Sequence, residues 1–160
     1  ATSPSGQVFF YDEIFEACTA DILAEMIVEK LRPYFVASEW MDPSGFVTTM
    51  TDKSCFADYM NQAGLAPEKA SKDLKRGILE TEVALKTPNY LYFAHNLTRT
   101  LYEFDNYVYD DPDRKPDQPR DKDDHMMEGL HRLVMGGLGY IDQMMYDEKP
   151  SSAPNYLLTL

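Results

Sequence analysis

The feature of this sequence that most restricts its fold is the alternation of short apolar runs with stretches of helical periodicity. Residues 8–11 (VFFY) have the β-rich composition of a strand and follow a leader of Ser, Pro and Gly. In residues 18–35, apolar side chains recur at three- and four-residue spacing, which is typical of an amphipathic helix. Thr19 is the expected N-cap, and Pro33 is expected to end the helix. A chain that changes period in this way is predicted to pack strands and helices in layers.

The alternation continues along the rest of the chain. The apolar run at 34–45 is predicted to be a buried strand that ends in the turn Asp-Pro-Ser-Gly, because Pro fixes φ and Gly permits a positive φ. The further expected elements are a helix over 51–65, a helix over 71–87 with Ser71 as cap and Leu74, Ile78 and Leu85 inward, a strand over 89–95, a helix over 96–109 with Leu97, Leu101 and Phe104 inward, a polar loop over 110–122, and a helix from 121 to about Tyr140. This order predicts an α/β fold with a largely parallel sheet.

Length and composition are those of one soluble domain with room for a core. The chain has 160 residues, of which 44% are hydrophobic and 26% charged. With no visible repeat or boundary, residues 1–146 are predicted to form a single domain and 147–160 a loosely attached tail. No run of about 18 apolar residues is present, so no membrane span is expected. The start, ATSPSGQ, does not resemble a signal peptide.

The net charge, the cysteine content and the lack of a phosphate-binding loop argue against several classes of function. The formal net charge of −12 argues against a broad electrostatic grip on nucleic acid, although an enzyme that reaches DNA through a metal and a few lysines remains compatible with it. Cys18 and Cys55 form no CxxC pattern, which indicates a reducing compartment and argues against a zinc site or a disulfide framework. No GxxxxGK[ST] phosphate loop is present, which argues against an ATPase of the usual kind.

The stretch DKDDHMMEGLHRLVMGG (121–137) places acids and a histidine in one turn at the start of an apolar helix. Asp124 and Glu128 are separated by four residues, and His125 and Glu128 by three, so both pairs share a helix face. Asp42 is expected at the carboxyl end of a strand, where ligand sites in α/β sheets gather. Together these carboxylates would suit Mg²⁺ or Mn²⁺, and two such ions about 4 Å apart can support phosphodiester hydrolysis.

The competing interpretation of these acids is structural. Acids at a helix N-terminus are common caps because the helix dipole favours them. Asp12 and Glu13 could join a metal site, but solvation is the preferred interpretation for both. His95 and His131 are expected to be hydrogen-bonded structural residues.

The ordered motifs resemble the C-terminal nuclease domain of large terminase subunits, the DNA-packaging proteins of tailed bacteriophages. The resemblance covers roughly residues 7–140. It rests on the successive segments VFFYDEIFE, WMDPSG, DLKRGILETEVAL, LYFAHN, NLTRTLYEFDNYVYD and DDHMMEGLHRLV, the last of which is similar to a DHxxDALRY helix.

The resemblance implies an RNase H-like three-layer fold with a mixed, largely parallel central sheet flanked by helices. It also implies metal-dependent endonuclease cleavage of concatemeric viral DNA. Asp42 matches the second acidic ligand of the family, and Asp124, His125 and Glu128 match its final acidic cluster, where the last acid is usually Asp. The metal ligands would be Asp42, Asp124 and Glu128, with His125 as a further ligand or proton shuttle. The family's first acidic ligand lies on a strand upstream of the segment that matches residues 8–11, where this sequence has only ATSPSG. The family's first strands are therefore expected to be missing. Nuclease activity would then require that the first acidic ligand be supplied from elsewhere.

The same resemblance implies the partners. They are double-stranded DNA, an ATPase domain of the same or a split protein, the portal and the small terminase subunit, in the cytoplasm of the infected bacterium at the procapsid portal. The basic residues expected to face DNA are Lys72, Lys75, Arg76 and Lys122, with Arg114, Lys115 and Arg120 in the loop. The alternative function is that of a catalytically silent RNase H-like domain that only binds other parts of the packaging motor. An unrelated α/β protein whose helix cap mimics the motif is the third possibility.

Overall fold

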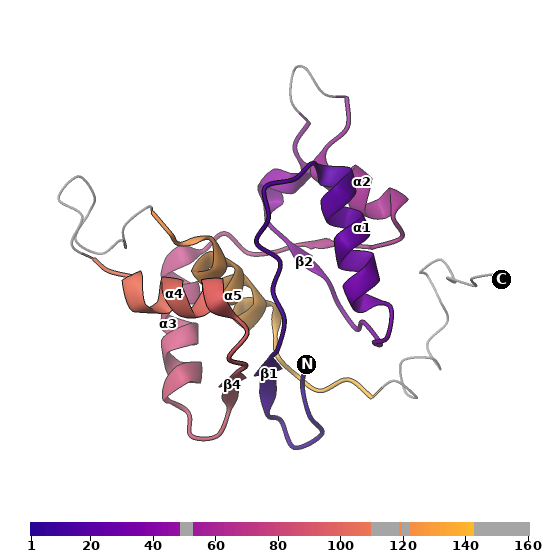
Figure 1. Ribbon diagram of the computed structural model, residues 1–160. Coiled ribbons are helices and arrows are strands. Elements are labelled where there is room, and N and C mark those ends of the chain that lie inside the picture. The colour runs from indigo at the N-terminus through magenta and orange to yellow at the C-terminus, as the bar shows by residue number, and fades with distance from the viewer. Residues whose placement is uncertain (49–52, 110–118, 120–121, 143–160) are drawn as a thin grey trace. The chain divides into compact units, whose positions relative to one another are not determined.

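The computed structural model describes residues 1–48, 53–109, 119 and 122–142 (Figure 1). The chain divides into two compact units. The first unit combines Ala1–Phe15 with Ser71–Tyr140, and the second combines Glu16–Ala70 with Ile141–Leu160. Helices and short parallel strands occur together in the described residues, so the predicted α/β class is confirmed. The prediction of a single domain over 1–146 stays a prediction.

A pair of parallel strands joins distant parts of the sequence in the first unit. β1 (Val8–Phe10) pairs with β4 (Leu91–Phe93) in parallel, as the order of elements predicted. Because successive strand residues point to opposite faces, the sheet carries an aromatic pair on each face. Phe10 stacks on Phe93 at 4.8 Å between ring centroids, and Phe104 meets Phe93 edge-on at 5.2 Å. These rings attach the helix that contains Phe104 to one face of the two strands.

Three helices complete the first unit: α3 (Leu74–Lys86), α4 (Thr98–Asn106) and α5 (His125–Gly136). α5 packs against both α3 and α4, and the three helices lie together in Figure 1. Gly77 permits the close approach of α3 to α5, because a Cβ there would lie 2.9 Å from the Cβ of His131. The expected helices are therefore present, although each is shorter than predicted.

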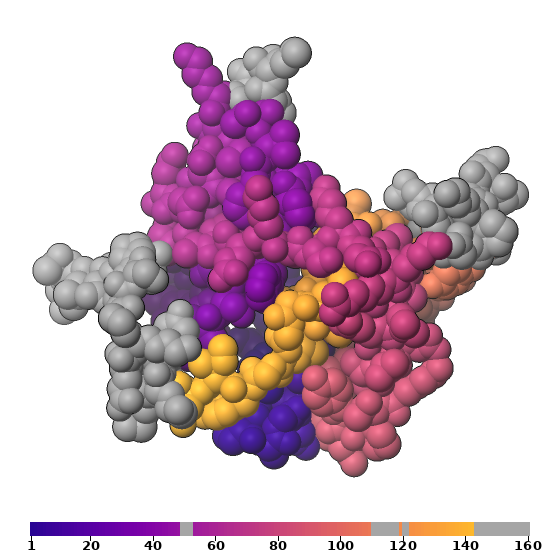
Figure 2. Space-filling view, turned by 180° about the vertical axis from the view of Figure 1, so that it is seen from behind, coloured from indigo at the N-terminus to yellow at the C-terminus, as the bar shows by residue number. Residues whose placement is uncertain are grey.

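The inner faces of these helices differ from the prediction. α3 is capped by Asp73 and not by Ser71, and its buried residues are Gly77, Thr81 and Ala84. Leu85, which we expected inward, is 44% exposed. Figure 2 shows residues of α3 at the surface of the first unit. Small side chains face α5 because the two helices approach closely, and the larger leucines are displaced from the contact.

α4 shows the same kind of difference. Leu97 is buried as expected, but Leu101 is 38% exposed, and the charged Glu103 is fully buried instead. α5 ends at Gly136 and not near Tyr140, because Gly137 takes a left-handed conformation with φ of 97°. Most of the expected loop at 110–122, with Arg114, Lys115 and Arg120, lies outside the described residues.

The second unit holds α1 (Ala20–Leu31), β2 (Trp40–Met41), a 3-10 helix η1 (Pro43–Phe46), α2 (Phe56–Gln62) and β3 (Glu68–Lys69). α1 packs against α2, and β2 pairs with β3 in parallel. Thr19 is the N-cap residue of α1, and the helix ends before Pro33, as predicted. No helix among the described residues is long and apolar enough to cross a membrane.

The expected buried strand over 34–45 is wrong in length and burial. Only two of its residues form a strand, neither of them is buried, and Tyr34 is 53% exposed. The Asp-Pro-Ser-Gly sequence begins η1 instead of a simple turn, because Pro at the first position favours a helical turn and Asp42 caps it. The helix expected over 51–65 begins only at Phe56, and residues 51 and 52 lie outside the described part.

Candidate functional site

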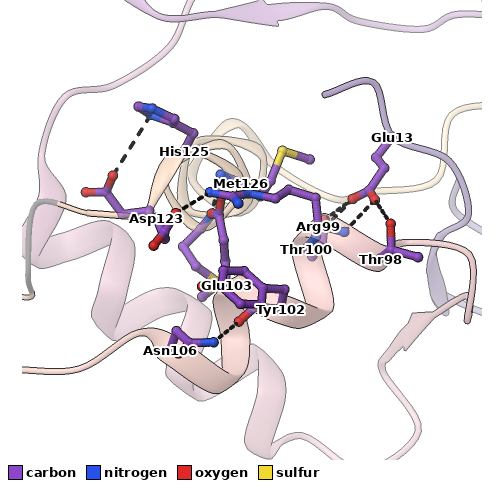
Figure 3. A network of polar contacts seen from close by, with 12 residues as sticks. Glu13, Thr98, Arg99, Thr100, Tyr102, Glu103, Asn106, Asp123, His125 and Met126 are labelled. Carbon is purple, nitrogen blue, oxygen red and sulfur yellow. Dashed lines mark hydrogen bonds and ion pairs between the residues drawn. The ribbon is translucent and has the colours of Figure 1, made fainter. Parts of the chain in front are cut away.

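The N-terminus of α5 is capped by a carboxylate from another helix. Glu103 of α4 is fully buried, and its Oε2 accepts hydrogen bonds from the backbone N–H of Met126 at 2.6 Å and of Met127 at 3.1 Å (Figure 3). The first N–H groups of a helix have no partner within the helix, and a negative charge there also meets the favourable end of the dipole. Glu103 therefore joins α4 to the start of the helix that carries the predicted acidic cluster.

Arg99 connects three parts of the first unit around this cap. Its Nε lies 2.7 Å from Oε1 of Glu103, and its Nη2 lies 2.7 Å from Oδ1 of Asp123. The guanidinium also stands 4.3 Å from the ring centroid of Phe15 and 5.2 Å from that of Tyr102. Ion pairs to both carboxylates raise the pKa of Arg99. The guanidinium thus fixes the turn immediately before α5, where Asp123 takes a left-handed φ of 53°.

A second carboxylate caps α4 in the same manner. Glu13 accepts hydrogen bonds from the backbone N–H of Arg99 at 2.8 Å and of Thr100 at 3.0 Å, and from the Thr100 hydroxyl at 2.7 Å. Burial acts to raise the pKa of Glu13, but these hydrogen bonds outweigh it and lower the pKa. The prediction that Glu13 is simply solvated is wrong, because its side chain is the cap of α4.

The predicted acids at the start of α5 have distinct environments. Asp124 is the N-cap residue by position and is 8% exposed, yet its side chain makes no capping hydrogen bond, because Glu103 binds the first N–H groups. The side chain of His125 is exposed, and its Nδ1 lies 3.9 Å from Oδ1 of Asp124. Glu128 pairs with Arg132, four residues further along the helix, at 2.9 Å.

A buried histidine lies on the same helix. His131 is 3% exposed; its Nδ1 lies 2.9 Å from the Thr81 hydroxyl, and its Nε2 lies 3.2 Å from the Tyr107 hydroxyl. Burial lowers the pKa of His131 to about 4, so the ring is neutral at pH 7. The expectation of a hydrogen-bonded structural histidine is confirmed here, whereas His95 is exposed.

The pKa of Tyr107 is raised mainly by burial of its hydroxyl. Tyr109 and the carboxylates of Asp124 and Glu128 raise it further. The backbone N–H of Glu128 donates to the carbonyl of Asp124 at 2.7 Å, so the two residues are one helical turn apart. That their carboxylates form one site stays a prediction.

Asp42 belongs to the second unit. Its carboxylate accepts a hydrogen bond from the backbone N–H of Ser44 at 2.6 Å and another from the Ser44 hydroxyl, so it serves as the cap of η1. A site that joins Asp42 to the acids of α5 stays a prediction. Within the described ranges, no group of three or more His, Cys, Asp or Glu residues is placed so that it could hold a metal ion.

The basic residues predicted to face DNA lie at the surface of the first unit. Lys72 precedes α3, Lys75 and Arg76 lie in its first turn, and Lys122 precedes α5; all four are exposed. Nε of Arg76 lies 2.6 Å from Oε1 of Glu80 on the same helix. Their role toward DNA stays a prediction.

Sequence reasoning missed Arg99 and Glu103 and assigned Glu13 to solvent. One signal was present: Leu97, Thr100 and Glu103 follow one another at three-residue spacing, and all three are buried. The Arg99–Glu103 pair also has the i, i+4 spacing of a helical ion pair. The assumption that only apolar residues mark the inner face hid this pattern.

In comparisons with known proteins, no family model, no curated protein and no solved structure matches this chain significantly.

Proposed function

We propose that this chain is the RNase H-like nuclease domain of a tailed-bacteriophage large terminase, a Mg²⁺- or Mn²⁺-dependent endonuclease that cleaves concatemeric viral DNA during packaging. The observation that supports the proposal is the position of Asp124 and Glu128 one turn apart at the start of α5, where the backbone N–H of Glu128 donates to the carbonyl of Asp124 at 2.7 Å. Because Glu103 caps the helix, the carboxylate of Asp124 is not used for that purpose. The order of motifs along residues 7–140 supports the same function.

The donor chemistry of these residues fits a hard divalent cation, which prefers carboxylate oxygens. Asp124 and Glu128 would hold the metal, and the bound ions would activate water and stabilise the leaving oxygen. Asp42 as a further ligand stays a prediction. The exposed imidazole of His125, whose Nδ1 lies 3.9 Å from Oδ1 of Asp124, would serve as a further ligand or as a proton shuttle. Lys72, Lys75, Arg76 and Lys122 would contact the phosphates, which limits the DNA contact to a few cations on an otherwise acidic chain.

The proposed partners follow from this function. An ATPase domain, in the same or a split protein, would deliver the DNA, and the portal and small terminase subunit would hold the assembly at the procapsid in the host cytoplasm. Charge on the chain itself cannot supply that attraction, since the formal net charge is −12.

Two ion pairs favour the second candidate, a catalytically silent domain that binds other parts of the packaging motor. Asp123 pairs with Arg99 and Glu128 pairs with Arg132, so two acids of the cluster have cationic partners within the chain. An acidic cluster neutralised in this way can serve only to fix the start of α5.

A plasmid-nicking assay in Mn²⁺ separates the two candidates. The variants are Asp42→Ala and Asp124→Ala, and the matched control is Asp105→Ala, an exposed acid of α4 outside the cluster. The nuclease proposal expects metal-dependent nicking by the unaltered chain and by Asp105→Ala, and loss of nicking in the other two variants. Absence of nicking together with absence of a calorimetric signal for Mn²⁺ would refute the nuclease and favour the silent domain.

A further inference from the structure

The two-stranded sheet of the first unit has one covered edge and one open edge. The start of the chain runs antiparallel to β1: the backbone N–H of Phe9 donates to the carbonyl of Ala1 at 2.7 Å, and that of Ser3 donates to the carbonyl of Gln7 at 2.8 Å. Figure 1 shows this start beside β1, on the side away from β4. Among the described strands, β4 pairs only with β1, so its other edge is where the sheet can gain a strand.

The backbone groups of β4 divide between its two edges. The N–H of Val8 donates to the carbonyl of Tyr90 at 2.8 Å, so Tyr90 directs its backbone toward β1. Because neighbouring residues of a strand direct their backbone groups to opposite edges, Leu91 and Phe93 present theirs at the open edge. Within the described ranges, no other backbone group bonds to them and no helix packs extensively along this edge. Exposed donors and acceptors in such a row form a template for a further strand.

The sequence of this sheet suits a second copy of the same strand. Neither β1 (VFF) nor β4 (LYF) contains a charged residue. Two β4 strands can therefore lie side by side without like charges opposite each other, although the whole chain has a formal net charge of −12. A sheet of only two strands is also smaller than most stable sheets, and pairing of two copies would enlarge it.

An exposed pair of aromatic rings lies on the sheet face opposite α4. Phe9 stacks on Tyr92 with 5.0 Å between ring centroids and an interplanar angle of 15°. The two residues are 37% and 36% exposed. In an antiparallel pair of β4 strands centred on Tyr92, this residue faces its own equivalent at a position without backbone hydrogen bonds, where side chains lie close. The aromatic stack would then continue from one copy into the other, which is a favourable cross-strand contact.

We propose that two copies of this chain associate through β4, in an antiparallel two-fold contact centred on Tyr92. Leu91 of each copy exchanges both of its backbone hydrogen bonds with Phe93 of the other copy, so the contact satisfies the open edge of both strands. A contact of this kind uses the same surface on both copies and closes at the dimer. The inference goes beyond the proposed function and does not depend on a metal site.

Sedimentation velocity of the intact chain over a range of concentrations tests this contact. Tyr92→Lys would set two like charges opposite each other and should lower the association constant at least about tenfold. The matched control is Tyr140→Lys, which makes the same substitution at a tyrosine that is 45% exposed and lies outside the sheet, and it should associate like the unaltered chain. Association should strengthen between about 0.1 M and about 1 M salt, because screening weakens the repulsion between two acidic chains.

A charge swap tests the register. Tyr92→Glu alone should associate as weakly as Tyr92→Lys, whereas an equimolar mixture of the two variants should recover the dimer, because residue 92 of one copy faces residue 92 of the other. If circular dichroism shows that a charged variant does not fold, Tyr92→Thr keeps a β-forming residue, removes the ring and should also weaken the dimer.

Several results would overturn the proposal. They are a monomer at every concentration and salt, a dimer that Tyr92→Lys leaves unchanged, a mixture of the charged variants that stays monomeric, and assemblies larger than two. A chain that dimerises only after removal of residues 143–160 would also overturn it, in favour of that segment as the occupant of the β4 edge.

Discussion

Removal of the buried carboxylate of Glu103 should be among the most damaging single changes in the first unit. Glu103 accepts hydrogen bonds from Met126 and Met127 and pairs with Arg99 while fully buried. Glu103→Ala would therefore remove a helix cap and a buried ionic partner in one step. The start of α5 and the turn before it both depend on this residue.

The size of the effect follows from these contacts. Loss of one partner of a buried ion pair costs about 3–5 kcal/mol, and loss of a helix cap costs about 1 kcal/mol. Because the two contributions share one carboxylate, we expect Glu103→Ala to lower the free energy of unfolding by about 4 kcal/mol. Glu103→Gln keeps an acceptor oxygen but loses the charge, so its cost should be about 2 kcal/mol.

Urea denaturation followed by circular dichroism measures these differences. The matched control is Glu82→Ala on α3, where an exposed glutamate pairs with Lys86 four residues away. Such a pair contributes about 0.3–0.5 kcal/mol, so the control should be nearly neutral. Amide hydrogen exchange adds a local readout, since the N–H groups of Met126 and Met127 should lose protection in Glu103→Ala.

The result that would refute the reasoning is equally specific. If Glu103→Ala costs no more than Glu82→Ala, the buried carboxylate does not hold the start of α5. Unchanged protection of Met126 and Met127 in a folded Glu103→Ala variant would lead to the same conclusion.

Two further predictions concern the cap of α4 and the contact between α3 and α5. Glu13→Gln should lower the free energy of unfolding by about 1 kcal/mol at pH 7. In the folded chain the pKa of Glu13 lies below its ordinary value of 4.5. The contribution of the ionised Glu13 to the free energy of unfolding is therefore complete above about pH 4.5 and is lost as the pH falls through the lower pKa. In urea titrations the difference between the variant and the unaltered chain should shrink toward acid pH, and a constant difference would contradict this. Gly77→Ala should destabilise by about 1–3 kcal/mol in thermal or urea unfolding, because its Cβ would lie 2.9 Å from His131 and 3.0 Å from Met135. Gly129→Ala on α5 meets no atom within 4 Å and should instead stabilise by about 0.5–1 kcal/mol, so equal effects of the two alanines would refute the packing argument.

Periodicity predicted the kinds of elements and their order well, because local patterns decide whether a segment is helical or extended. α1 and its N-cap residue, the strands β1 and β4, and the parallel direction of the sheet were expected from the sequence, whereas the pairing of β1 with β4 was not specified. The boundaries were less accurate, because neighbouring parts of the chain set them. The run at 34–45 has the composition of a buried strand, but only Trp40–Met41 find a partner strand.

The candidate site could be predicted only in part, for a related reason. The i, i+4 relation of Asp124 and Glu128 is a property of one helix and can be read from the sequence. The contacts of Glu13 and Glu103 cross between elements. The spacing of Leu97, Thr100 and Glu103 indicates that Glu103 faces inward, but it does not reveal which helix Glu103 caps. The structural interpretation, in which the acids of this turn cap α5, is wrong for Asp124, because the capping carboxylate comes from Glu103 of α4.

The parallel pairing of β1 with β4 determines the order in which this protein can form during synthesis. The first unit is interrupted by the segment Glu16–Ala70, which is synthesised before any residue of β4. The aromatic side chains of β1 therefore remain without their partner strand until β4 has been made and has emerged. Pairing of β1 with β4 must close the long segment between them, and this closure has an entropic cost that grows only slowly with segment length. Strand pairs this far apart in the sequence form slowly. Glu16–Ala70 leaves the ribosome before Ser71–Tyr140, and the first unit can be completed only after α5 has emerged.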